Sequence, residues 1–381
     1  MGKLELYIPV GRERLRCGYT TGTCAAAAAA GAAALLLEGV ALPAVHIDTP
    51  AGVRVEAELL KHAAGEGWAA CAVRKDGGDD PDVTDGALIC ARVERSTGPG
   101  IAIDGGEGVG RVTRPGLDQP VGEAAINSVP RRMIARAAEE EAAALGYAGG
   151  LEITISVPGG EEAARRTFNP QLGVEGGISI LGTSGIVEPM SEAALLATIR
   201  LDIRQQAAGG PGTLVLTPGN YGETFVRERL GLDLDRAVKC SNYIGASIDM
   251  AVEEGIREVL LVGHAGKLVK VAAGIMNTHS SVADGRMEIL AAHGAACGAG
   301  PELVEQILES ITVDQALEYM EQVPGLGQAV MDRVIRRMDG CLRRRAGKAM
   351  KIEAVVFTNA RGLLGRTKGA DGLIEKIKAG G

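Results

Sequence analysis

Aromatic residues are scarce in this sequence, and no sustained run of basic residues accompanies them. Phe, Trp and Tyr together make up 3% of the 381 residues, and there is a single Trp. Proteins that hold nucleic acid neutralise phosphates with Lys and Arg, and many stack bases on aromatic rings. Because the formal net charge is −8, we expect no nucleic-acid partner, and the acidic balance mainly aids solubility.

Metal-binding and disulfide spacings are also missing. No two of the 7 cysteines form a C-x-x-C pair, and none of His264, His279 and His293 falls into a zinc-binding spacing. An odd, scattered set of cysteines is typical of a reducing compartment. We therefore predict a cytoplasmic protein with no metal centre of its own. The cysteines are Cys17, Cys24, Cys71, Cys90, Cys240, Cys297 and Cys341.

The main apolar run is too short to cross a bilayer. It extends from Cys24 to Leu37 and stays below the roughly 18 residues that a membrane-spanning helix needs. The segment before it carries Glu5 and Glu13 among its arginines, which is not typical of a signal peptide. We predict no membrane partner.

Two glycine-containing stretches lack the spacing of known nucleotide-binding loops. Gly182-Thr183-Ser184-Gly185 does not match G-x-G-x-x-G, and Gly263-His264-Ala265-Gly266-Lys267 has the wrong spacing for a Walker loop, with no Ser or Thr after the Lys. Such turns at helix starts can still hold carboxylates, or the ribose and amino-acid parts of a cofactor. They serve as often simply to turn the chain.

Glycine and alanine are the residues that the sequence has in excess. The 55 glycines are about twice the usual share of roughly 7%, which indicates many tight turns and close backbone approaches. Thr20-Thr21-Gly22-Thr23 leads directly into the alanine run Ala25–Ala34. We predict a helix that begins near Thr23, with Thr23 as N-cap.

The start of this helix has two readings. Its unpaired N–H groups, the threonine hydroxyls and the nearby Arg16 form a combination that holds anions. The alternative is a well-capped helix packed closely in the core, which we favour for the body of the helix.

The first half of the chain predicts an α+β domain over residues 1–177. Apolar and polar residues alternate over 45–48, 53–57, 69–73 and 87–93, which favours strands with mainly antiparallel pairing. Residues 101–104 and 108–113 suggest a hairpin. A helix is expected over 130–145, followed by a strand over 151–157.

From residue 178 the pattern changes to α/β, and we place a second domain over 178–381. Continuous apolar strands over 178–181, 214–216, 259–262 and 354–357 are each followed by a polar turn, most of them containing glycine, and then by a helical segment. Repeats of this kind indicate a mainly parallel, Rossmann-like sheet with helices on both faces. The turns then lie at the carboxyl ends of the strands, where such sheets bind ligands.

Two further features are candidates for chemistry. Residues 76–85 contain five Asp, a cluster that lacks the calcium-loop pattern but suits either a solvated turn or contact with a cationic ligand. His264 and Lys267 lie in a predicted strand-end turn, where a basic group can meet carboxylates or transfer a proton.

Taken together, several separated motifs resemble one known family, the cobalt-precorrin-5B C1-methyltransferases of anaerobic vitamin B12 synthesis. The resemblance extends from about Leu15 to the end of the chain. The motifs, in the order of the family, are Arg16–Cys24 with the alanine helix, Lys75–Thr84, Gly108–Leu117, Asn169–Met190, Leu216–Glu223 and Gly263–Lys267.

The resemblance implies methyl transfer from S-adenosylmethionine to carbon 1 of a cobalt-containing tetrapyrrole, giving cobalt-precorrin-6A. Cobalt would enter only as part of the substrate, and a homo-oligomer stays open. Because the macrocycle carbon is the nucleophile and the sulfonium the electrophile, the protein mainly has to align them.

From these considerations we predict two sets of binding residues, with His264 as a positioning or proton-transfer residue. Carboxylate arms of the substrate are assigned to Arg16, Thr20, Thr21, Thr23 and Lys267. The methyl donor is assigned to Gly182, Thr183, Ser184, Gly185, Thr217, Gly219, Asn220 and Asp80. Two other functions stay open: a non-catalytic tetrapyrrole carrier of the same pathway, and a phosphoryl-transfer enzyme.

Overall fold

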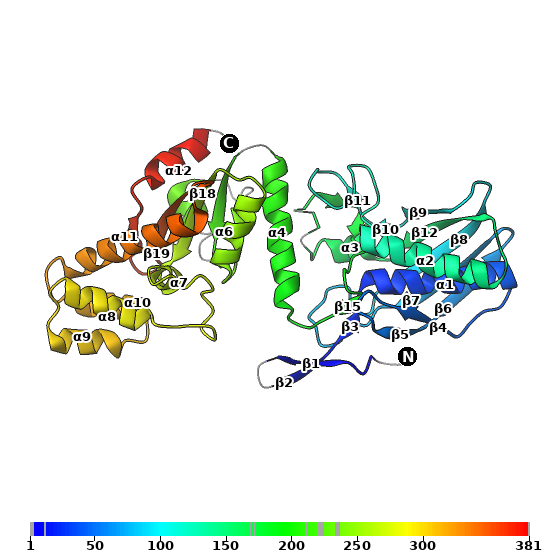
Figure 1. Ribbon diagram of the computed structural model, residues 1–381, viewed down its shortest axis with the longest axis horizontal. Helices are drawn as coiled ribbons and strands as arrows, with labels where there is room; N and C mark the ends of the chain where they lie inside the picture. The colour runs from blue at the N-terminus through cyan, green and yellow to red at the C-terminus, as the bar shows by residue number, and fades with distance from the viewer. Residues whose placement is uncertain are drawn as a thin grey trace. The chain divides into compact units, whose positions relative to one another are not determined.

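The chain folds into two compact units, Met1–Glu192 and Ala193–Gly381, which we call the first and the second unit. The structure is a computed structural model, and it describes residues 4–10, 13–167, 169–170, 172–209, 212–219, 225–232 and 237–379. Both units combine helices with β-sheet (Figure 1).

The first unit is built on a five-stranded sheet of order β6-β7-β8-β12-β9, antiparallel except between β12 and β9. The strands of the whole first unit are β1 (Tyr7–Val10), β2 (Glu13–Arg16), β3 (Gly18–Tyr19), β4 (Ala44–Asp48), β5 (Arg54–Glu58), β6 (Leu60–Gly65), β7 (Trp68–Arg74), β8 (Leu88–Ser96), β9 (Ile101–Gly105), β10 (Gly108–Val109), β11 (Arg111–Val112), β12 (Gly150–Ser156), β13 (Val174–Glu175), β14 (Gly177–Ile178) and β15 (Ile186–Val187). Its helices are α1 (Thr21–Glu38), α2 (Ser128–Ala144) and α3 (Gly160–Ala164).

Helix α1 is the centre of the first unit. It lies beside α2 and packs on β7 and β8 (Figure 1), and every residue from Thr21 to Ala34 is buried. By length and composition α1 would suit a membrane, but 78% of that stretch is inside the unit. Small side chains explain the fit: a Cβ on Gly31 would lie 2.3 Å from Leu59 Cδ1. The close-packed core helix that we favoured is therefore confirmed.

Two local predictions for the first unit are wrong. The N-cap of α1 is Thr20, not Thr23, because the Thr20 hydroxyl accepts from the Thr23 N–H at 3.2 Å. The expected hairpin over 101–113 is also not formed. Strand β9 instead pairs in parallel with β12, and β10 and β11 pair with β14 and β13. Partners far along the chain therefore replace the local pairing that the sequence suggested.

The second unit begins within helix α4 and contains a second five-stranded sheet. Its strands are β16 (Thr213–Thr217), β17 (Ala237–Lys239), β18 (Glu258–His264), β19 (Lys351–Thr358) and β20 (Gly362–Arg366). Its helices are α4 (Glu192–Ala208), η1 (Val226–Leu230), α6 (Ile244–Glu253), α7 (Ala265–Val271), α8 (Arg286–Ala296), α9 (Pro301–Leu308), α10 (Val313–Met320), α11 (Leu326–Ala346) and α12 (Ala370–Ala379).

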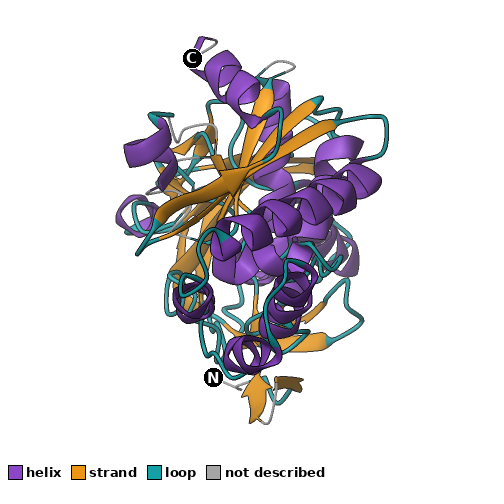
Figure 2. Ribbon diagram, turned by 90° about the vertical axis from the view of Figure 1, so that its left-hand side faces the viewer, coloured by secondary structure: helices purple, strands orange, loops and turns teal. Residues whose placement is uncertain are grey.

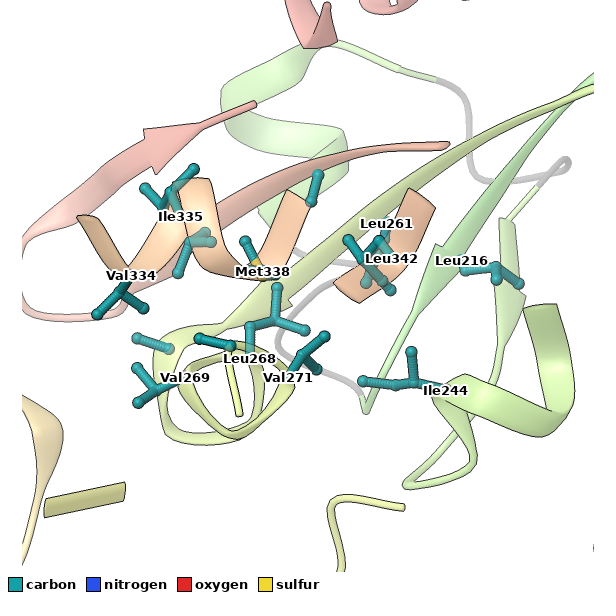
Figure 3. Close-up of a cluster of buried hydrophobic side chains, with 14 of the residues drawn as sticks. Leu216, Ile244, Leu261, Leu268, Val269, Val271, Val334, Ile335, Met338 and Leu342 are labelled. Atoms are coloured by element: carbon teal, nitrogen blue, oxygen red, sulfur yellow. The ribbon is translucent and has the colours of Figure 1, made fainter. Parts of the chain in front are cut away.

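The second sheet has the order β17-β16-β18-β19-β20, parallel except for the antiparallel edge strand β20. Helices lie on both of its faces (Figure 2). Leu216 and Leu261 face α7 and α11 in one cluster of buried side chains (Figure 3), whereas Val215 and Leu260 face α12 in another. Burial on both faces explains the continuous apolar strands of the sequence.

We expected residues 178–192 to begin the second unit, but they do not. Ile178 pairs with Val109 in β10, and Ile186 pairs with Tyr19 in β3, so this segment is folded into the first unit. The division between the units consequently falls at Glu192 rather than at residue 177. Of the four predicted parallel strands, those at 214–216, 259–262 and 354–357 form the second sheet, and the one at 178–181 does not.

Candidate functional site

Strands β17, β16 and β18 are neighbours in the second sheet, and their carboxyl ends lie along one edge of it. Between β16 and β18 the order in which the chain adds strands changes direction. From β16 the chain moves outward to β17, and it then returns to β18 on the other side of β16. In open parallel sheets, ligands bind outside the carboxyl ends of strands at such a reversal. We call this edge the switch-point site.

The turns after β16 and β18 approach each other closely at this site. A Cβ on Gly263 would lie 2.8 Å from Pro218 Cγ, and one on Gly219 would lie 3.4 Å from Lys267 Nζ. Gly219 also has a φ of +96°, which disfavours other residues. The predicted residues Thr217, Gly219, His264 and Lys267 are therefore brought together. Asn220, which we predicted beside them, lies outside the described residues.

His264 is the N-cap of α7, and its Nδ1 accepts from the Gly266 N–H at 3.1 Å. Nδ1 must therefore be unprotonated, so the neutral ring carries its proton on Nε2. Burial lowers the pKa of His264, and the Asp314 charge opposes this shift only partly. The ring also meets Phe357 edge-on, with centroids 5.8 Å apart. This arrangement suits a hydrogen-bond donor that positions a ligand better than a general base.

Lys267 brings a positive charge to the switch-point site. The residue is half-buried, and its Nζ lies 3.5 Å from the Ser241 carbonyl oxygen that follows β17. Burial lowers the pKa of Lys267, and the nearby Lys270 lowers it further. Because this long contact is the one hydrogen bond of the ammonium within the described part of the chain, donors stay available for a carboxylate.

Thr217 contributes an unpaired hydroxyl at the end of β16. Its side chain is fully buried, and Oγ1 has no hydrogen-bond partner among the residues that the structure describes. Leaving a buried hydroxyl unpaired costs about 1–3 kcal/mol. A polar ligand group beside the turn would remove that cost.

The start of α1, in contrast, is occupied by hydrogen bonds within the first unit. The Gly22 N–H donates to the Leu181 carbonyl oxygen at 3.1 Å, and the Thr23 hydroxyl donates to the Gly185 carbonyl oxygen at 2.7 Å. The Thr21 hydroxyl accepts from the Leu181 N–H at 2.9 Å. Thr20, Thr21 and Thr23 are all buried. These bonds argue against the anion site that we predicted there.

Arg16 is paired as well. Its guanidinium forms a two-pronged ion pair with Asp76, at 2.7 and 2.8 Å, with both side chains largely buried. Its backbone N–H also donates to Asp79 at 2.6 Å. A guanidinium that is already neutralised is a poor clamp for substrate carboxylates.

The acidic loop 76–85 is held by its own carboxylates. Asp82 pairs with the buried Lys75 at 2.6 Å, Asp85 accepts from the Gly77 N–H at 2.7 Å, and Asp80 accepts from the Met190 N–H at 3.0 Å. The turn interpretation of this loop is supported. Asp80 lies in the first unit, whereas the switch-point site belongs to the second.

The loop Gly182–Gly185 also belongs to the first unit. Its carbonyl groups accept from the N–H groups of Thr20 and Ala51. A Cβ on Gly182 would lie 2.4 Å from Thr20 Cβ, and its φ is +130°. The predicted donor-binding set is thus split: Gly182, Thr183, Ser184 and Gly185 lie in one unit, and Thr217 and Gly219 in the other.

Comparison with known proteins identifies the family. Residues 9–189 match the family model CbiD, and residues 277–368 match the model described as CbiD, C-terminal domain. A protein of Ruminiclostridium cellulolyticum named cobalt-precorrin-5B C(1)-methyltransferase is 48% identical over 93% of this chain and 92% of its own length. The chain belongs to the CbiD family.

Two other CbiD-family proteins show how far the similarity extends. A protein of Alkaliphilus metalliredigens with the same name is 43% identical over 99% of both chains. The crystal structure of the cobalamin biosynthesis protein (cbiD) from Archaeoglobus fulgidus is 31% identical and covers 74% of this chain and 87% of that one, with a TM-score of 0.39. The first CbiD model ends at residue 189, close to the end of the first unit at Glu192.

Neither of the buried cysteines Cys24 and Cys240 suits the role of a nucleophile in this CbiD-family chain. Burial raises the pKa of Cys24 and of Cys240 to about 12, so both stay thiols near neutral pH. Among the residues that the structure describes, no three His, Cys, Asp or Glu side chains gather as metal ligands.

Sequence reasoning missed Lys270, which holds one wall of the switch-point site. Its Nζ is buried and donates to the carbonyl oxygens of Thr278 and Ala283, at 3.2 and 2.8 Å. The Thr278 N–H in turn donates to the Asn242 carbonyl oxygen after β17 at 2.9 Å. The available signal was the spacing of Lys267 and Lys270, which places them on neighbouring turns of one helix.

Proposed function

We propose that this chain transfers the methyl group of S-adenosylmethionine to carbon 1 of cobalt-precorrin-5B, giving cobalt-precorrin-6A in anaerobic cobalamin biosynthesis in the cytoplasm. The observation that carries the proposal is similarity over nearly the full length to relatives of that name. One is 48% identical over 93% of the chain, and another is 43% identical over 99%. The tetrapyrrole is the acceptor substrate, and its cobalt arrives with it.

The switch-point site is the proposed position of the methyl donor. The support is the order of its parallel strands, whose reversal lies between β16 and β18. The site also fits the polar groups of S-adenosylmethionine, because it offers an ammonium at Lys267 and an unpaired hydroxyl at Thr217. Gly219 lets the backbone come close to a bound molecule.

Each group at the site has a proposed task. When it is bound, S-adenosylmethionine supplies an electrophilic methyl group. Lys267 pairs with the carboxylate of its amino-acid part, and the Thr217 hydroxyl bonds a polar atom of the same molecule. His264 keeps α7 capped through its Nδ1. Alignment of donor and acceptor carbon at roughly 3–3.5 Å supplies several kcal/mol of the barrier, and no side-chain nucleophile takes part.

The test is direct transfer of label. The purified chain is incubated with cobalt-precorrin-5B and S-adenosylmethionine that carries an isotopically labelled methyl group, and the macrocycle is analysed by mass spectrometry. One labelled methyl per macrocycle, formed without ATP and Mg²⁺, supports the proposal. Tight binding of the macrocycle without label would indicate a carrier, and a requirement for ATP would indicate phosphoryl transfer.

A further inference from the structure

The first unit contains a cavity that none of the predicted site residues except Thr183 touches. Its volume is 450 Å³, within the range of about 300–1,000 Å³ that is usual for small-molecule sites. One wall is a face of α2, and the opposite side is formed by the end of β4, the turn at Thr49 and Pro50, and the loop that carries Thr183.

The face of α2 gives this cavity an apolar floor and two guanidinium groups, and the acids Asp48 and Glu140 also line it. Val129, Met133 and Ala137 line it at helical spacing, and Arg132 and Arg136 line it from the same face of the helix. Met133 and Ala137 are buried, whereas both arginines are exposed. An apolar surface bordered by guanidinium groups suits a flat, apolar ligand with carboxylates at its edge.

The two arginines differ in how available they are. Arg132 has no hydrogen bond or short ion pair with any residue that the structure describes; its charge acts on Asp118, which is itself bonded to Ser128, so the donors of Arg132 can still take a ligand carboxylate. Arg136 pairs with Glu140 at 2.7 Å, one turn further along α2. That pair is exposed and contributes little energy, so a carboxylate of a ligand can replace Glu140.

The well-bonded loop Gly182–Gly185 has a clear purpose if the cavity is a binding site. The Gly185 carbonyl oxygen accepts from the Thr20 N–H and the Thr23 hydroxyl, which fixes the loop against the start of α1. Thr183 itself is exposed and lines the cavity. The start of α1 would then act as a support for this wall.

We propose that this cavity binds a carboxylate-bearing edge of the tetrapyrrole acceptor, with Arg132 and Arg136 on its acid arms and the apolar face of α2 beneath the ring. The inference rests on the proposed function for the identity of the acceptor. Arg132 and Arg136 replace Arg16 as the carboxylate-binding residues of the first unit, because Arg16 is already paired.

The binding test uses uroporphyrin, a tetrapyrrole with eight carboxylates, and the full-length chain. Its fluorescence anisotropy is followed at increasing protein and salt concentrations. We expect saturable binding that weakens with salt, and at least tenfold weaker binding for Arg132→Glu. Glu140→Gln frees Arg136 and should tighten binding severalfold, which loss of structure cannot imitate. Arg165→Glu makes the same charge change at the C-cap of α3, outside the residues that line the cavity, and should bind as the unmodified chain does.

Equal uroporphyrin affinity in the unmodified chain, Arg132→Glu and Glu140→Gln would overturn the inference. Label transfer distinguishes this failure from failure of the proposed function. If the chain methylates cobalt-precorrin-5B but Arg132→Glu leaves the KM for that substrate unchanged, the function stands and the cavity assignment falls. If no label is transferred while uroporphyrin binding still depends on Arg132, the cavity assignment stands as a tetrapyrrole site and the methyltransferase proposal falls.

Discussion

The starts of α1 and α7 are similar in composition but differ in their hydrogen-bond partners. Each helix has glycine at its second position and a polar residue at its third, Gly22 and Thr23 in α1 and Gly266 and Lys267 in α7. At α1 the hydroxyls of Thr21 and Thr23 bond to backbone groups of residues 181 and 185, and all of these atoms are in one unit. At α7 the Lys267 ammonium reaches, among the residues that the structure describes, one carbonyl oxygen at 3.5 Å.

This difference separates a helix start whose polar groups are already bonded from one that we propose binds a ligand. A helix start attracts ligands because its N–H groups and flanking side chains lack partners. Where a segment far along the chain supplies those partners, the same residues hold two segments of the fold together. The experiments below test whether polar groups in the first unit around α1 act on stability, and those at α7 on binding.

The largest effect is expected from Asp82→Asn in the first unit. The Lys75 side chain is 1% exposed, and its ammonium lies 2.6 Å from the Asp82 carboxylate. Removing one partner of a buried pair costs about 3–5 kcal/mol. Urea unfolding should show this loss, with donor affinity unchanged in the protein that remains folded. Lys75→Met, which removes the buried charge, should cost clearly less.

The same pair predicts a pH dependence of stability. Burial by itself raises the pKa of Asp82, but Lys75 and the Thr84 hydrogen bonds outweigh it, so the pKa of Asp82 is below its usual value. The pair therefore contributes its full stabilisation of the first unit above the pKa of Asp in the unfolded chain, about 4. This contribution to stability is lost as the pH falls through the lower pKa of Asp82 in the folded chain. A flat stability profile in this acid range would contradict the role of Lys75 and Asp82 as a structural pair.

The next largest effect is expected from Lys267→Ala at the start of α7. A charged hydrogen bond to a carboxylate contributes about 1.5–3 kcal/mol, so affinity for S-adenosylmethionine should fall roughly tenfold to a hundredfold. Calorimetric titration measures this change, and the unfolding midpoint should hardly move. Unchanged affinity would show that α7 resembles α1 after all.

If Lys267 binds the donor as proposed, its charge should also set the alkaline limit of donor binding. Because burial lowers the pKa of Lys267, the ammonium is lost at a lower pH than in an ordinary lysine, and affinity should fall as the pH rises through that value. In Lys267→Arg the charge persists, so the fall should move to higher pH. Identical alkaline limits in both proteins would exclude Lys267 as the titrating group.

A smaller effect is expected from Thr20→Val, which removes the N-cap hydroxyl of α1. Loss of an N-cap costs about 1 kcal/mol, and the Thr20 hydroxyl also lies 3.3 Å from that of Thr23. The first unit should unfold at a lower urea concentration, while binding of S-adenosylmethionine stays the same. A selective loss of binding without loss of stability would restore the anion site that we first predicted at α1.

The elements that sequence alone predicts are those with a strong local pattern. Alternation over 69–73 and 87–93 identified β7 and β8, and the apolar runs at 214–216 and 259–262 identified β16 and β18. Strand β17 has only 3 residues, and β20 contains Gly362 and Gly365, so neither has a pattern that could be read.

The candidate site was harder to predict because its residues are defined by distant partners. The turn at Gly182 looks the same in sequence whether it ends a strand of the second sheet or closes on Thr20, which is far away along the chain. Arg132 was missed because an exposed arginine on a helix normally faces solvent. Only the fold shows that its helix face borders a cavity.

The smallest effect is expected from His264→Asn, and it decides whether α7 contributes a proton acceptor. Asn is a good N-cap, so it replaces the bond from His264 Nδ1 to the Gly266 N–H. If His264 only caps the helix and donates a hydrogen bond, methyl transfer should slow less than about fivefold, under 1 kcal/mol. General bases contribute about a hundredfold or more. A loss of that size, with unchanged affinity for S-adenosylmethionine and loss of the rate's dependence on pH near neutrality, would mean that His264 moves a proton, and the tautomer inferred from its cap would have to change during the reaction.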